Sequence, residues 1–165
     1  MNENFEAVVQ LVDETGFKVE MTAGMPTWEA FPGMRHQKAI VRLLSSIVPI
    51  PGHQGTCGCF YVTDAYLRFS DGSIKRPDVA IFCEEPPDVD EAVEMLPAAV
   101  VEVLSKGYER KDIEVSAPFY LQAGVLDVIL FDPRTAAVTH LRRDGEQHLT
   151  SPVTLDLECG CRITV

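Results

Sequence analysis

The spacing of hydrophobic residues divides the chain into helical and extended segments. Residues 5–12 carry apolar side chains at helical spacing and precede Gly16, which predicts a short amphipathic helix. The clearest helix is predicted over residues 34–48, where Pro49 ends a stripe of apolar positions: Ile40, Leu43, Leu44, Ile47 and Val48. A further helix is predicted between residues 111 and 123, capped by Gly124, and a shorter one over residues 89–96.

The remaining apolar runs predict strands. Residues 98–104 are an almost unbroken apolar run, which is typical of a strand that is covered on both faces. Residues 25–33 contain two prolines and a glycine, so we predict a loop there. Together these elements predict one α/β domain over residues 1–165, with a mixed sheet flanked by helices. Strands are predicted over residues 17–21, 59–69, 78–83 and 125–131, and extra antiparallel strands over residues 136–142 and 153–165.

Composition narrows the functional classes. No stretch approaches the roughly 18 apolar residues of a membrane span, and the N-terminus lacks the basic and apolar regions of a signal peptide, so we expect a cytoplasmic protein. The net charge of −11 argues against binding of nucleic acid through a large positively charged surface. A local basic rim can still coexist with an acidic body, so a nuclease is not excluded.

Two acidic residues lie where apolar ones are expected. Asp78 opens the apolar run Val79-Ala80-Ile81, and Glu102 lies inside the run over residues 98–104. A buried lone charge costs several kcal/mol unless it is paired or binds a metal. If the two strands are neighbours, both carboxylates converge on one divalent cation, and a water bound there can attack a phosphodiester.

An ordered set of motifs surrounds these two acids. It consists of Arg76-Pro77-Asp78-Val79, Val101-Glu102-Val103-Leu104-Ser105, Arg110-Lys111-Asp112, residues 120–125 (Tyr-Leu-Gln-Ala-Gly-Val) and Phe131-Asp132-Pro133. In this order and spacing the chain resembles the Uma-two-like family of restriction endonucleases, in the PD-(D/E)XK nuclease superfamily. The resemblance extends over residues 17–133 and is weaker around Glu20 and Arg35-His36-Gln37.

The resemblance implies that the mixed sheet flanked by helices is a restriction-endonuclease-like core. It also implies a DNA endonuclease that uses Mg²⁺ or Mn²⁺ and acts as a homodimer or higher homo-oligomer. Asp78 and Glu102 would be metal ligands, with the carbonyl of Val103 as a third and Glu20 as a ligand or a neighbour of the ligands. His36 matches a family histidine beside the site.

The lysine of this superfamily is missing from both expected positions. Leu104 stands two residues after the glutamate, and Ser116 stands where the related family has a lysine on the following helix. Lys106 and Lys111 are the candidate catalytic replacements, and the alternative is that both are solvated surface lysines. Pro118 favours a helix that begins near Ser116, with this serine as its N-cap.

Two hypotheses about the function therefore remain open. One is a Mg²⁺- or Mn²⁺-dependent endonuclease, and the other is a catalytically inactive binding or assembly module of the same fold. The second could be stabilised by Zn²⁺ through two Cys-Gly-Cys pairs: Cys57, Cys59, Cys159 and Cys161. The alternative for these cysteines is burial as small apolar residues, which is our interpretation of Cys83, and disulfides are not expected in the cytosol.

Overall fold

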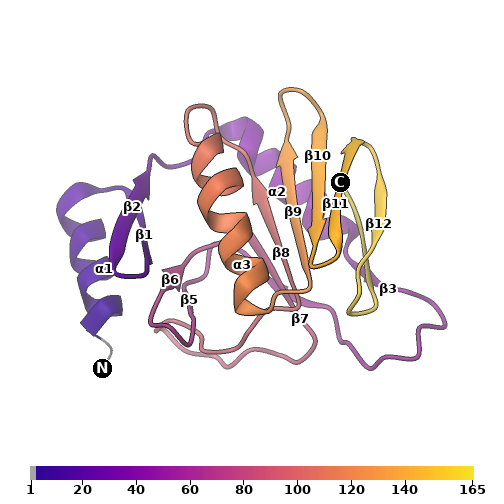
Figure 1. The fold of residues 1–165 in the computed structure, drawn as a ribbon, viewed down its shortest axis with the longest axis horizontal. Helices are drawn as coiled ribbons and strands as arrows, with labels where there is room; N and C mark the ends of the chain where they lie inside the picture. The colour runs from indigo at the N-terminus through magenta and orange to yellow at the C-terminus, as the bar shows by residue number, and fades with distance from the viewer. Residues whose placement is uncertain (1–2) are drawn as a thin grey trace.

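The computed structural model describes residues 3–165 and contains three of the four predicted helices (Figure 1). Helix α1 covers Glu3–Thr15 and α2 covers Met34–Ser46, both close to the predicted ranges. A π-helical segment η1 (Lys111–Ser116) runs directly into α3 (Ala117–Ala123). Gly124 ends α3 in the left-handed conformation with φ of 104°, as the sequence predicts.

A six-stranded mixed sheet forms the centre of the molecule. Strands β8 and β9 pair in parallel, and every other neighbouring pair is antiparallel. The mixed α/β fold that we predicted is therefore confirmed. In spatial order the strands are β11 (Gly145–Thr150), β10 (Ala137–Arg142), β9 (Asp127–Asp132), β8 (Ala99–Val103), β7 (Val79–Phe82) and β4 (Phe60–Val62).

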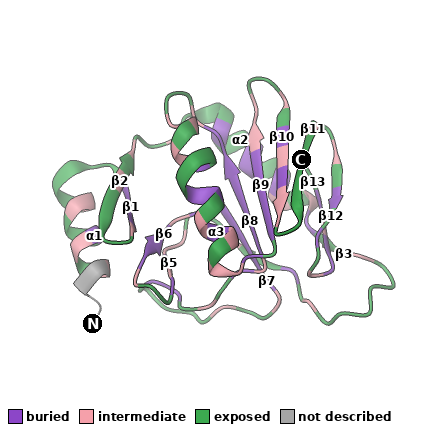
Figure 2. Cartoon of the chain, in the orientation of Figure 1, coloured by how far each residue is buried: buried purple, intermediate pink, exposed green. Residues whose placement is uncertain are grey.

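Helices cover the two faces of this sheet, so its central strands are buried throughout (Figures 1 and 2). Because side chains alternate along a strand, Ile81 and Val101 pack with α2, whereas Phe82 and Val100 pack with α3. This double cover explains why residues 98–104 form an unbroken apolar run instead of an alternating one. It also places Glu102 in a fully enclosed strand.

Two smaller sheets flank the central one. The first has the order β2 (Met25–Glu29), β1 (Lys18–Thr22), β6 (Ile74–Lys75) and β5 (Leu67–Arg68), and α1 packs against it. The second has the order β12 (Thr154–Asp156), β13 (Cys161–Thr164) and β3 (Val48–Pro49). The first sheet contributes charged side chains to the site described below.

The buried carboxylate of Asp127 connects the C-terminal strands to the central sheet through hydrogen bonds. Asp127, at the start of β9, lies 2.7 Å from His140 Nε2 and accepts a hydrogen bond of 2.6 Å from Arg142 Nε. It also accepts a hydrogen bond of 2.8 Å from the backbone amide of Glu158, which follows β12. Burial would raise the pKa of Asp127, but these hydrogen bonds lower it.

Four local predictions were wrong. Residues 25–29 form β2 instead of a loop, because this strand lies at the edge of its sheet, where Pro26 needs no partner for its nitrogen. Residues 89–96 form no helix, and Val93 makes an isolated bridge to Leu67 instead. The strand predicted over residues 59–69 is interrupted near Asp64, whose φ is 54°, and β11 was not predicted.

The cysteines also depart from expectation. Cys57 and Cys83 are joined as a disulfide, as are Cys59 and Cys161, although we expected none. Cys83 is half-buried and lies among the other cysteines rather than in the apolar core. The cause is local backbone pairing, because the amide of Gly58 donates to the carbonyl of Cys83 at 2.8 Å.

No helix within residues 3–165 is both long enough and apolar enough to cross a membrane.

Candidate metal centre

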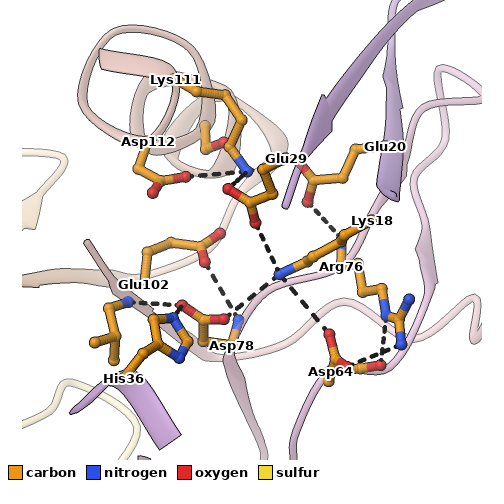
Figure 3. Close-up of polar contacts among 12 residues, drawn as sticks. Lys18, Glu20, Glu29, His36, Asp64, Arg76, Asp78, Glu102, Lys111 and Asp112 are labelled. Carbon is orange, nitrogen blue, oxygen red and sulfur yellow. Dashed lines mark hydrogen bonds and ion pairs between the residues drawn. The ribbon is translucent and has the colours of Figure 1, made fainter. Parts of the chain in front are cut away.

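Asp78 and Glu102, the two acids singled out by the sequence, lie side by side in the structure. Strands β7 and β8 are neighbours, with Val79 opposite Val101. The backbone amide of Asp78 donates to Glu102 Oε2 at 3.2 Å, and the amide of Val103 donates to Asp78 Oδ2 at 2.8 Å. Figure 3 shows both carboxylates directed into one cluster of charged side chains.

One residue from each sheet-covering helix orients these carboxylates. His36, in the first turn of α2, places Nε2 3.0 Å from Asp78 Oδ2. Tyr120, in α3, is fully buried and donates its hydroxyl hydrogen to Glu102 Oε1 at 3.0 Å. The two helices on opposite faces of the sheet therefore fix the two acids.

Glu20 holds the side chains of two lysines in the site through hydrogen bonds. This buried residue of β1 accepts hydrogen bonds from Lys75 Nζ at 2.8 Å and Lys111 Nζ at 3.2 Å. The backbone amide of Arg76 donates to it at 2.7 Å. Lys75 is itself completely buried, and its Nζ donates to Ser116 Oγ at 3.1 Å.

A third lysine and two further acids complete the cluster. Lys18 Nζ lies 3.4 Å from Asp78 Oδ1 and 3.3 Å from Glu29 Oε1. Lys111 Nζ lies 3.4 Å from Glu29 Oε2 and 3.2 Å from Asp112 Oδ1. Asp112 Oδ1 is buried and accepts no hydrogen bond, so the ion pair with Lys111 is its contact in the cluster.

The cluster holds more negative than positive charge. Five carboxylates, those of Glu20, Glu29, Asp78, Glu102 and Asp112, surround the ammonium groups of Lys18, Lys75 and Lys111. The carboxylates therefore outnumber the ammonium groups by two, and Glu102 is the one carboxylate of the five that forms no ion pair within residues 3–165. The Arg76 guanidinium does not offset this excess, because it pairs with Asp64.

The pKa directions follow from this imbalance. Burial, together with the nearby charges of Asp112 and Asp78, raises the pKa of Glu102 well above its usual value. Burial likewise raises the pKa of Asp112 to about 6, against the opposing effect of Lys111. Burial opposes ionisation of Asp78, but the His36 hydrogen bond and the Lys18 charge lower its pKa. Glu102 is thus the carboxylate whose charge is least compensated by the protein.

Comparisons with known proteins identify the family and a similar fold. A family model described as "Uma2: Putative restriction endonuclease" matches residues 4–159, nearly the whole chain. The chain belongs to the Uma2 family. A crystal structure described as a "putative nuclease belonging to DUF820" from Anabaena variabilis ATCC 29413 is similar in fold, with a TM-score of 0.63 and 16% identity. The match covers 83% of this chain and 79% of that one. No curated protein matches the chain.

The structure separates the two candidate lysines. Lys111 lies inside the cluster, whereas Lys106 is exposed and makes no ion pair within residues 3–165. Ser116 precedes α3, but its side chain makes no capping hydrogen bond because the π-helical turns continue into α3 and the hydroxyl contacts Lys75. The expectation of Ser116 as an N-cap was therefore wrong.

Sequence reasoning missed Lys18, Lys75, Glu29 and Tyr120 as members of the site. A signal existed for Lys18, which stands two residues before Glu20 and so shares its face of the strand. Lys75 was harder to find, because the burial of β6 depends on α1 and the first small sheet. Glu29 falls in the segment that was wrongly predicted as a loop.

Basic residues gather beside the site in an otherwise acidic protein. Two grooves of about 570 and 270 Å³ share Arg35 and Pro133, and the smaller one reaches His36. Within the described residues, five lysines and arginines form no ion pair. Four of them line the two grooves: Arg35, Lys38, Arg42 and Lys106. The fifth, Arg143, lines neither groove. The unpaired positive charge is therefore concentrated along one side of the candidate site.

Proposed function

We propose that this chain is a metal-dependent endonuclease that hydrolyses DNA phosphodiester bonds at the carboxylates of Asp78 and Glu102. The observation that carries the proposal is the buried cluster of five carboxylates and three ammonium groups. Its carboxylates outnumber its ammonium groups by two, and Glu102 forms no ion pair within residues 3–165. A buried charge that has no partner opposes folding, so a bound cation accounts for an arrangement that is otherwise unfavourable.

The donor atoms of the cluster suit Mg²⁺ or Mn²⁺, which prefer oxygen ligands. Asp78 and Glu102 would hold the ion, with the Val103 carbonyl and Glu20 as further candidate ligands. Asp112 Oδ1, the buried oxygen without a hydrogen bond, can take part directly or through water. When bound, such an ion lowers the pKa of a coordinated water and so supplies the nucleophile for phosphodiester hydrolysis.

Lys111 is the residue that we propose in place of the family lysine. Its Nζ lies among the carboxylates, and Glu20, Asp112 and Glu102 raise its pKa against the effect of burial, so the group is a permanent cation. A fixed ammonium there can stabilise the negative charge that develops on the phosphate in the transition state. Lys75, held beside Ser116, would keep Glu20 ionised and in position.

The two basic grooves are the surface that we propose for the DNA backbone. Lysines and arginines that have no carboxylate partner are free to pair with phosphates, and release of counterions then favours binding. Arg35 and Lys106 both line the groove that reaches His36. A strand held there by its phosphates would lie next to the carboxylate that His36 orients.

A cleavage assay on supercoiled plasmid and single-stranded DNA with Mg²⁺ or Mn²⁺ tests the proposal. We expect nicking by the wild type and none by Asp78→Ala or Glu102→Ala, since either change removes a metal ligand. Arg143→Met is the matched control, because Arg143 is exposed and lies outside both the cluster and the two grooves. Cleavage that survives in both alanine variants would assign the activity to a contaminant or to another site.

Absence of cleavage under all these conditions, from folded protein that binds Mn²⁺, would favour the inactive module instead. Leu104 and Ser116, which occupy the two usual lysine positions, are the observation behind that alternative.

A further inference from the structure

All five cysteines of the chain meet at one place, on the side of the central sheet that faces the second small sheet. They come from three segments: the turn before β4, the end of β7 and the turn between β12 and β13. Cys57 Sγ lies within 4.8 Å of the sulfur of each of the others: Cys59, Cys83, Cys159 and Cys161. The sequence gives no reason for Cys83 to join the two Cys-Gly-Cys pairs, and the fold brings it there.

Backbone contacts build this cluster without help from the sulfur atoms. The amide of Gly58 donates to the carbonyl of Cys83 at 2.8 Å, which ties the first pair to the end of β7. In the second pair, the amide of Leu157 donates to the carbonyl of Cys161 at 2.8 Å. Gly160 there has a φ of 96°, and a Cβ at this position would lie 2.3 Å from the His53 ring. Both tight turns therefore depend on glycine between the two cysteines.

Two separate disulfides do not account for the convergence. The Cys57–Cys83 and Cys59–Cys161 pairs touch each other, with 3.5 Å between the sulfurs of Cys57 and Cys161. A disulfide needs only two sulfurs, so neither pair requires the other, nor the fifth cysteine, Cys159. Four thiolates on one tetrahedral Zn²⁺, with Zn–S bonds of about 2.3 Å, place neighbouring sulfurs about 3.8 Å apart. That spacing is close to the 3.5 Å between the sulfurs of Cys57 and Cys161, which belong to different disulfides.

We propose that the thiol form of this cluster binds one Zn²⁺ through Cys57 and three of the other four cysteines. Each ligating thiol loses its proton to solvent and forms one Zn–S bond, so four protons are released for each ion bound. Cys57 is a ligand in every such set, because it is the sulfur that both close groups share. The fifth cysteine stays a free thiol.

The site would act as a structural cross-link. It joins the hairpin formed by β12 and β13 to the end of β7, the strand whose other end carries Asp78. Structural zinc sites with four protein ligands contribute directly to folding, so removal of the ion would loosen the C-terminal hairpin. This role does not depend on the nuclease activity, since its ligands are sulfur and the acidic cluster offers oxygen.

Metal analysis and thiol counting on the same sample test the proposal. The full chain is purified with a phosphine reductant, which is then removed without oxygen. We expect about one zinc per chain. Denaturation with guanidinium and a chelator, without reductant, should then expose all five thiols of the sequence. A sample without zinc would overturn the proposal, and so would a single reactive thiol after denaturation, which would show two disulfides.

Variants assign the ligands. Cys57→Ser should lose the zinc, and among serine variants of the other four cysteines one should retain it. Stepwise mercurial modification of the wild type should release one zinc as four thiols react, and this measurement stands even if Cys57→Ser fails to fold. Glu102→Gln is the control for specificity and should keep its full zinc content. Zinc retained by folded Cys57→Ser would overturn the assignment.

Discussion

Substitution of Glu102 by glutamine should stabilise the metal-free protein at neutral and alkaline pH. Glutamine has the shape of glutamate and can keep both contacts. Its carbonyl oxygen accepts from the Asp78 amide, and its amide group donates to the Tyr120 hydroxyl oxygen, which rotates to suit. The change therefore removes the buried charge and its repulsion with Asp78 and Asp112, and leaves the packing unchanged.

The sign of the effect follows from the raised pKa of Glu102. A folded-state pKa above the unfolded value gives stability that is complete at low pH and is lost as pH rises through the folded pKa. The variant avoids that loss, so its advantage should be absent near pH 4 and present at pH 8. Replacing poorly compensated buried charges by neutral groups stabilises proteins by about 1–2 kcal/mol, near the low end of the reported range. In a chain of this length that corresponds to about 2–8 °C in Tm.

Thermal unfolding at pH 4 and pH 8, in buffer freed of Mg²⁺ and Mn²⁺, measures this effect. Tyr120→Phe is the matched comparison, because it removes a hydrogen-bond donor from the same carboxylate and keeps the charge. It should lower the stability by about 1–3 kcal/mol. A Glu102→Gln protein that melts below the wild type at pH 8 would refute the reasoning, since the lysines would then compensate Glu102 fully.

Three further predictions address the lysines, the fold and the DNA surface. Lys111→Met should reduce cleavage about 10²–10³-fold while Arg143→Met, at a residue outside the cluster and both grooves, leaves it nearly unchanged, as measured by plasmid nicking; equal losses would remove Lys111 from its proposed role. Asp127→Asn should cost about 2–3 kcal/mol at pH 7. Because the pKa of Asp127 is lowered in the fold, that cost should shrink as pH falls below its usual value of 3.8, and urea titrations that show a constant difference would contradict this. Lys38→Glu should weaken DNA binding and flatten its salt dependence more than Arg143→Glu, which changes the net charge equally, and equal effects would rule out the basic grooves.

The sequence predicts the elements whose pattern is set locally. The apolar stripe that begins at Ile40 and the covered run over residues 98–104 appear as α2 and β8, because burial of one helix face and of one whole strand sets these two patterns. The helix ends at Ser46, two residues earlier than predicted, and Val48 lies in β3. The edge strand β2 could not be predicted in this way. Its residues are mostly exposed, it contains Pro26, and it forms only because β1 offers it a partner.

Within the site, residues could be predicted where a charge interrupts an apolar strand. Asp78 and Glu102 satisfy that condition, and the structure places them in contact through the backbone of β7. Lys75 and Lys18 lie on short strands, and their burial reflects packing between sheets and helices. The cysteine cluster shows the same limit, because Cys83 joins it only through the pairing of β7 with the preceding turn.

The most direct test of the central claim is the number of Mn²⁺ ions bound to the acidic cluster. Electron paramagnetic resonance of free Mn²⁺ during a titration gives this number, with the cysteine site filled by zinc beforehand. We predict about one Mn²⁺ per chain for the wild type and for Lys106→Met, and none for Asp78→Ala or Glu102→Gln. Wild-type protein that binds no Mn²⁺, or variants that bind as much as the wild type, would contradict the claim that these two carboxylates hold a divalent cation.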